Sequence, residues 1–121
     1  MRKFGRYIRQ RREALRLQDP RFSVRQVATR VGVEPSYLSK VERDLEGPPS
    51  ERRVRALARE LSEDPDYLLA MAGKVSSDLH RAICHRPQLF ATLIREIERL
   101  SDDAINKLLR RIRRNRRGDK E

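Results

Sequence analysis

His80, Cys84 and His85 are the side chains of this sequence best suited to metal binding or nucleophilic chemistry. His80 and Cys84 stand at i, i+4 spacing and would share one face of a helix, as two zinc ligands can. A tetrahedral site needs more ligands, and beyond His85 the chain has no other histidine or cysteine. Cys84 and His85 are adjacent and would point about 100° apart on a helix, so they are not a nucleophile and its base. The pattern favours surface histidines and a packed thiol.

No other group of residues indicates catalysis. The sequence has no glycine-rich phosphate loop, and no Ser, His and Asp or Cys and His arrangement has a plausible third member. A chain of 121 residues has the size of one domain, or of one small domain with an appendage, which does not suit a large enzyme with a deep cleft. We therefore expect no enzymatic activity, no metal and no cofactor.

Charge is the remaining source of chemistry. The net charge is +11, and it divides into +5 over residues 1–73, zero over 74–106 and +6 over 107–121. Lysines and arginines that neutralise phosphates release condensed counterions and so gain free energy. The two basic blocks therefore predict a polyanionic partner.

Compartment signals are few. The single cysteine excludes an intramolecular disulfide framework, and no apolar stretch of signal-peptide length follows the basic start. No apolar run approaches the length that spans a membrane. We expect a reducing, cytoplasmic location and no membrane partner.

Helical spacing of the apolar residues predicts an all-α protein with roughly seven or eight short helices. The first helix should cover about 3–16, and the segment 18–21 should interrupt it. Its inward residues are predicted to be Phe4, Ile8, Ala14 and Leu15.

The next two helices are defined by their ends. Ser23 followed by Gln26 forms a capping-box pattern, which starts a helix at residue 24 that Gly32 ends. Pro35 can occupy a first helical position, so a third helix should run from there to about residue 43.

Further helices follow similar signals. Ser50 should cap one with an inner stripe of Val54, Leu57, Ala58 and Leu61. Pro65 should open the next, which has Tyr67, Leu68 and Met71 on its apolar side and ends at Gly73 as a C′ glycine. We divide the chain there, into a domain over 1–73 and a helical extension over 74–121. In the extension we expect Ser77 to cap one helix, and Pro87 and Ser101 to begin two more.

The segment from Ser23 to Arg43 carries the most specific pattern. Two helices that cross sharply over a short turn need a small residue where they touch, which Ala28 supplies, and a residue free to adopt positive φ, which Gly32 supplies. They also need apolar residues that lock the pair, and these are predicted to be Val27, Val31, Val33, Leu38 and Val41.

This segment resembles the helix-turn-helix of the lambda and 434 phage repressors, the xenobiotic response element family, and the resemblance extends over about residues 4–73. It implies a five-helix lambda-repressor-like DNA-binding domain whose second motif helix lies in the major groove of double-stranded DNA. It also implies a scaffold pair between Arg12 and Glu42. The longer connection over 18–22 departs from the family pattern. By position, the base-reading residues are predicted to be Pro35, Ser36, Tyr37, Ser39 and Lys40.

Phosphate contacts are predicted for Ser23, Arg25 and Arg43, and Arg43 matches a family position that touches phosphate. Pro35 has no hydrogen-bonding side chain, which shifts base reading toward Ser36 and Lys40. These expectations describe a transcriptional regulator, most simply a repressor, that binds an inverted-repeat operator as a homodimer.

Two questions stay open at this point. The apolar helices of 76–112 either mediate dimerisation or fold back on their own subunit, and the arginines of 110–117 are a second nucleic-acid contact, a polybasic arm or cations at a helix C-terminus. We expect 113–117 to run into solvent beyond the apolar stripe. An alternative function is a protein-interaction module, antitoxin-like or the substrate of a regulatory protease, with DNA binding secondary. Small repressors of mobile elements, some encoded beside a metalloprotease that relieves repression, have a similar arrangement.

Overall fold

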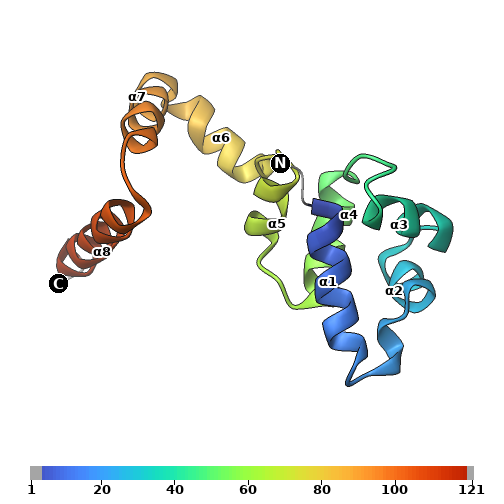
Figure 1. Ribbon diagram of the computed structural model, residues 1–121. Helices are drawn as coiled ribbons and strands as arrows, with labels where there is room; N and C mark the ends of the chain where they lie inside the picture. Colours follow the sequence, from blue (N-terminus) through green and yellow to red (C-terminus); the bar gives the residue numbers. More distant parts are fainter. Residues whose placement is uncertain (1–3, 120–121) are drawn as a thin grey trace. The chain divides into compact units, whose positions relative to one another are not determined.

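The computed structural model describes residues 4–119 (Figure 1), and every regular element within them is helical, as predicted. A 3₁₀ turn, η1 (Pro20–Phe22), lies between the first two α-helices. The predicted helix start at residue 3 lies outside the described residues. The α-helices are α1 (Phe4–Arg16), α2 (Val24–Val31), α3 (Pro35–Glu42), α4 (Glu51–Leu61), α5 (Pro65–Met71), α6 (Ser77–His85), α7 (Pro87–Glu98) and α8 (Asp102–Asp119).

The chain forms two compact units, of which the first ends at Leu79 and the second begins at His80. In the first unit, α1 to α5 enclose one hydrophobic core, with α1 packed against α3 and α4, and α2 against α3 and α4. The inner stripe predicted for α4 is buried in full. The buried apolar residues are Phe4, Ile8, Val27, Ala28, Leu38, Val41, Val54, Leu57, Ala58, Leu61, Leu68 and Leu69.

Two core predictions were wrong. Ala14 is exposed, because Arg12 takes the inward position of that turn of α1. Tyr67 is 48% exposed and stacks edge-on against Tyr7 at 5.6 Å between ring centroids, while Leu69 is fully buried in its place. The short helix α5 therefore turns a different face inward than its periodicity suggested, whereas Gly73 ends it with φ +75° as predicted.

Gly5 lets α1 approach the end of α3 closely. A Cβ atom at this position would collide with the carbonyl oxygen of Val41 and with the carboxylate of Asp44. Only a glycine allows this contact, because a backbone carbonyl cannot move aside as a flexible side chain would. No local signal in the sequence marks this glycine.

The end of the first unit is held by polar contacts to α4. The side chain of Glu51 accepts hydrogen bonds from the backbone and the hydroxyl of Ser77 at 3.3 and 3.2 Å. Ser76, not Ser77, caps α6, since its buried hydroxyl accepts from the Leu79 amide at 3.4 Å. Glu51 also accepts a hydrogen bond from Arg55. The bonds from the Ser77 amide and, next, from Arg55 lower the pKa of the Glu51 carboxyl.

The second unit packs more loosely. Pro87 is the first residue of α7, and the Ser101 hydroxyl caps α8 by accepting from the Ala104 amide at 3.1 Å. None of the side chains described in 80–118 is buried. Residues 113–117 are exposed, as expected, and α8 continues through them to Asp119. No helix within 4–119 is long and apolar enough to cross a membrane.

Candidate nucleic-acid interface

The first helix of the motif begins and ends where the sequence predicted. The Ser23 hydroxyl accepts a hydrogen bond from the Gln26 amide at 3.2 Å, which satisfies one of the free N–H groups at the start of α2. At its end, Gly32 has φ +91°, and the amides of Gly32 and Val33 both donate to the Ala28 carbonyl, at 2.8 and 3.0 Å. Ala28 itself is fully buried. The turn thus has the small contact residue and the positive φ that the helix crossing requires.

The second motif helix, α3, has equally defined ends. Pro35 is its first residue, where the missing N–H costs nothing. Beyond Arg43, Asp44 adopts φ +61° and the Leu45 amide returns to the Lys40 carbonyl at 2.8 Å, which closes the last turn. The helix is therefore fixed at both ends and presents a constant set of side chains.

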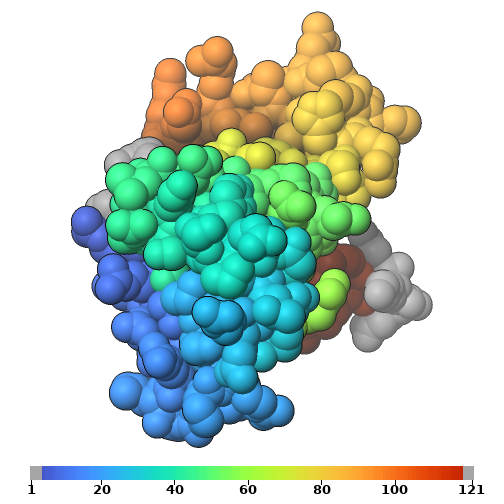
Figure 2. Space-filling model, turned by 90° about the vertical axis from the view of Figure 1, so that its right-hand side faces the viewer, coloured from blue at the N-terminus to red at the C-terminus, as the bar shows by residue number. Residues whose placement is uncertain are grey.

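One face of α3 is buried and the opposite face is free. Leu38, Val41 and Glu42 point into the first unit. Ser36 and Lys40, four residues apart, lie together on the outward face and are exposed. Ser39 is half-buried beside them, and Tyr37 and Pro35 are half-buried at the edges of that face. In Figure 2 the light-blue to teal surface of α2 and α3 occupies the middle of the view.

A buried ion pair fixes α3 to α1. The Arg12 guanidinium donates to both carboxylate oxygens of Glu42, at 2.7 and 2.9 Å, and each side chain is only 4% exposed. Arg12 also donates to the Phe22 carbonyl at 3.0 Å, so the pair reaches the connection before α2. The hydrogen bonds that Arg12 donates to Glu42 raise the pKa of Arg12 above its ordinary value. A bidentate pair of this geometry sets the orientation of α3 as well as its distance from α1.

Two of the three predicted phosphate contacts are exposed arginines, and the third is a cap. Arg25 lies exposed in the first turn of α2, where the helix dipole already favours an anion. Arg43 is exposed at the end of α3, and half-buried Ser23 uses its hydroxyl as the α2 cap. Arg30, also exposed on α2, is engaged differently, because it pairs with Glu60 and lies over the Phe22 ring at 5.3 Å.

The long connection before the motif is itself ordered. Asp19 caps η1 by accepting from the Arg21 amide at 3.0 Å, and its carboxylate also binds the Arg21 side chain. The side-chain hydrogen bond from Arg21 is the main reason that the pKa of Asp19 is lowered. The departure from the family pattern at 18–22 thus adds a short turn before the motif, and α1 still pairs with α3.

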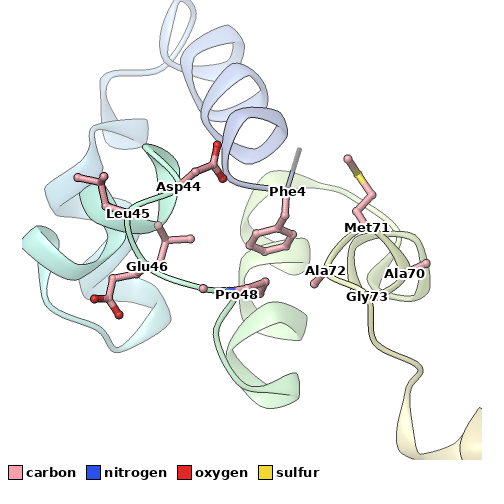
Figure 3. A pocket seen from close by; sticks show the side chains of 11 residues that line it. Phe4, Asp44, Leu45, Glu46, Pro48, Ala70, Met71, Ala72 and Gly73 are labelled. Atoms are coloured by element: carbon pink, nitrogen blue, oxygen red, sulfur yellow. The ribbon is translucent and has the colours of Figure 1, made fainter. Parts of the chain in front are cut away.

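A pocket of about 690 Å³ lies at the opposite end of α3 from Pro35. In Figure 3 the Phe4 ring lies between Pro48 and Ala72. Among the residues that line it, the ionisable ones are Asp44 and Glu46, so the pocket has no lysine, histidine or cysteine of its own. Its two carboxylates would repel a phosphate group, and we assign it no part in binding nucleic acid.

The histidine and cysteine pair does not form a site. The Cys84 sulfur lies 3.7 Å from Nδ1 of His80, as the spacing predicted. Cys84 is exposed, so the expectation of a packed thiol was wrong. Within the described part of the chain, no three His, Cys, Asp or Glu side chains gather where a metal ion could be held.

The chain also matches a known protein family. A helix-turn-helix domain model matches residues 3–68, which is more than half of the chain. The chain therefore belongs to the helix-turn-helix domain family, a DNA-binding family, and DNA is the partner that this domain indicates. Neither the curated proteins nor the solved structures gave a match.

Proposed function

We propose that this chain is a sequence-specific transcriptional regulator of the lambda and 434 repressor kind, and that it acts as a repressor. In this proposal α1 to α5 form the five-helix DNA-binding domain, within residues 1–73. Helix α3 enters the major groove and reads bases through Ser36 and Lys40, with Pro35, Tyr37 and Ser39 at the edges of the contact. Residues 74–121 form an extension that mediates dimerisation.

The observation that carries the proposal is the division of α3 into a buried and a free face. Leu38, Val41 and the Arg12–Glu42 pair hold one side, which leaves Ser36 and Lys40 free on the other. Lysine can donate to guanine O6 and N7 in the major groove, and serine can serve as donor or acceptor to any base. A fixed helix with free polar groups on its outer face suits base reading, because its backbone loses little conformational entropy on binding.

The decisive experiment selects bound duplexes from a random pool and then tests Lys40→Ala on the preferred sequence. Loss of a base contact should weaken binding to that sequence by about 1–3 kcal/mol and leave binding to unrelated DNA nearly unchanged. Lys74→Ala removes the same charge from an exposed position outside the helices and serves as the control. No preferred sequence, or equal loss on both duplexes, would contradict base reading by α3.

Arg43→Ala tests the phosphate assignment in the same assay. Removing one phosphate contact should weaken binding to both duplexes and reduce the salt slope by about 0.9. Arg25→Ala should behave in the same way. An unchanged slope would remove the residue from the interface.

Dimerisation is proposed because the second unit leaves large apolar side chains uncovered. Leu89, Leu93 and Ile94 of α7 are 67%, 47% and 49% exposed, and Ile112 of α8 is 54% exposed. A two-fold dimer would cover such residues and would match the symmetry of an inverted-repeat operator. Sedimentation equilibrium should give twice the chain mass of 14.3 kDa at the concentrations that bind DNA. A monomer under those conditions would contradict this part of the proposal.

A further inference from the structure

Helix α8 carries a continuous basic face. Arg110, Arg113, Arg114 and Arg117 follow at i, i+3, i+4 and i+7 and together line one shallow depression on its surface. All four side chains are exposed, and within residues 4–118 none of them forms an ion pair. We call this set the arginine stripe.

The apolar residues of α8 lie on the other side of the helix. Ile105 and Leu108 are half-buried, and Leu109 and Ile112 continue their face with 39% and 54% exposure. At 100° per residue, the mean direction of this face lies about 140° from that of the stripe. The packing of the second unit therefore leaves the arginines turned outward.

The helix dipole does not account for the stripe. Favourable interaction with the C-terminal dipole extends over the last turn only, and α8 ends at Asp119. Arg110, Arg113 and Arg114 precede that turn. Like charges three or four residues apart also destabilise a helix, and the stripe contains four such pairs. Because the stripe weakens the isolated helix, it is explained better by an anionic partner than by helix stability.

We propose that the arginine stripe is a second DNA-binding surface that contacts backbone phosphates without reading sequence. This inference rests on the proposed function, since DNA held by the helix-turn-helix is present near the tethered stripe at a high effective concentration. From Arg110 to Arg117 the helix rises about 10 Å, comparable to three base-pair steps of about 3.4 Å. Arginine also binds phosphate oxygens bidentately.

An anionic membrane is the competing partner, and the geometry disfavours it. A helix that lies on a membrane inserts its apolar face and carries its basic residues on the opposite, polar face. In α8 the two faces lie about 140° apart, as on such a helix, but its apolar face is already partly packed within the second unit. Insertion would remove Ile105 and Leu108 from their present packing.

The test compares two variants of the full chain that lose the same charge. The first changes Arg110, Arg113, Arg114 and Arg117 to Gln, and the control changes Arg81, Arg86, Arg95 and Arg99 to Gln, all of them exposed in the same unit. Glutamine is a good helix former, so both variants should keep their helices, which circular dichroism checks. Affinities for the selected duplex and for an unrelated duplex are measured between 50 and 200 mM salt, a range of about fourfold.

We expect the stripe variant to lose at least about tenfold in affinity for both duplexes at the lowest salt, and its salt slope to fall by up to about 3.6, or about 0.9 for each phosphate contact. Its preference for the selected duplex should stay unchanged. The control should lose much less and keep its slope.

Three outcomes would overturn the inference. The first is an unchanged slope in the stripe variant, and the second is an equal loss in the control, which would indicate net charge alone. The third comes from a parallel measurement with vesicles of anionic phospholipid, if the stripe variant loses vesicle binding and keeps its affinity for DNA. None of them affects the Lys40 test of base reading. Conversely, if selection yields no preferred sequence but the stripe variant loses its salt slope, the stripe stands and the proposed function fails.

Discussion

The two units of this protein differ in how far they bury their apolar side chains. Over the part that the structure describes, the first unit buries twelve apolar residues drawn from α1 to α5. The second, over its described residues, buries none and leaves Leu89 67% exposed and Ile112 54% exposed. Both have helices with one apolar face, so helix amphipathicity is common to them. The difference lies in whether the apolar faces meet within the unit.

This contrast separates two structural roles. A domain with a closed core can hold α3 in a fixed orientation through buried contacts, among them the Arg12–Glu42 pair. A unit without a closed core gains stability when its apolar faces are covered, which is the physical reason for the dimer in the proposed function. The arginines of the stripe on α8 belong neither to the closed core of the first unit nor to the apolar faces of the second.

The largest effect is expected from breaking the buried ion pair. Glu42→Ala leaves the buried Arg12 guanidinium with only the more exposed Glu13 carboxylate, at 3.4 Å, which should lower the free energy of unfolding of the first unit by up to about 3–5 kcal/mol. Lys107→Ala in α8 breaks an exposed pair with Asp103 and should cost at most about 0.5 kcal/mol. Urea unfolding followed by amide signals of each unit measures both. Similar costs for the two variants would show that the Arg12–Glu42 pair does not hold α3 against α1.

Core leucines give a similar contrast. Leu57→Ala removes a side chain that is only 2% exposed, and it should cost about 2–5 kcal/mol. Leu93→Ala, at a position 47% exposed, should change the stability of a single chain by less than about 0.5 kcal/mol but should weaken self-association. Unfolding and sedimentation equilibrium together separate the two effects. If Leu93→Ala left the association constant unchanged, α7 would not belong to a dimer interface.

Glycines in the two units should respond with opposite signs. Gly32→Ala forces a side chain into φ +91°, which should cost about 1–2 kcal/mol even though no atom lies within 4 Å of the new Cβ. Gly118→Ala, in the last turn of α8, should instead add up to about 1 kcal/mol of helix stability. Thermal unfolding measures the first, and helical ellipticity the second. An unchanged melting temperature in Gly32→Ala would mean that the turn relaxes without strain.

The smallest effect concerns the end of the first unit, where Glu51 holds Ser77. Because folding lowers the pKa of Glu51, the carboxylate stabilises this junction at pH values above its ordinary pKa. That stabilisation should be lost as the pH falls through the lowered value. Hydrogen exchange at the Ser77 amide should therefore gain protection as the pH rises from 3 to about 6, relative to Glu51→Gln. Equal protection in both proteins at every pH would exclude this contribution.

Sequence patterns predicted the helix ends well because those signals are local. A proline at a first helical position, the Ser23 cap and the positive φ of Gly32 each depend on a few neighbouring residues. The fixed ends of the motif in turn determine which residues share a face of α3. Once the bounds of α3 are predicted, residue spacing alone therefore indicates which of its side chains face outward.

The sequence by itself determined the all-helical class, the position of the motif and the excess of positive charge. Only the tertiary structure decided that Leu69 rather than Tyr67 is buried, that Ser76 rather than Ser77 caps α6, and that α1 approaches α3 at Gly5. Leu69 and Gly5 pack against residues far apart in the chain, and Ser77 is bound by the distant Glu51 while Ser76 makes the cap, so no local pattern encodes these choices. The stripe on α8 also needed the structure, because the arginines form one face only if the helix continues through them.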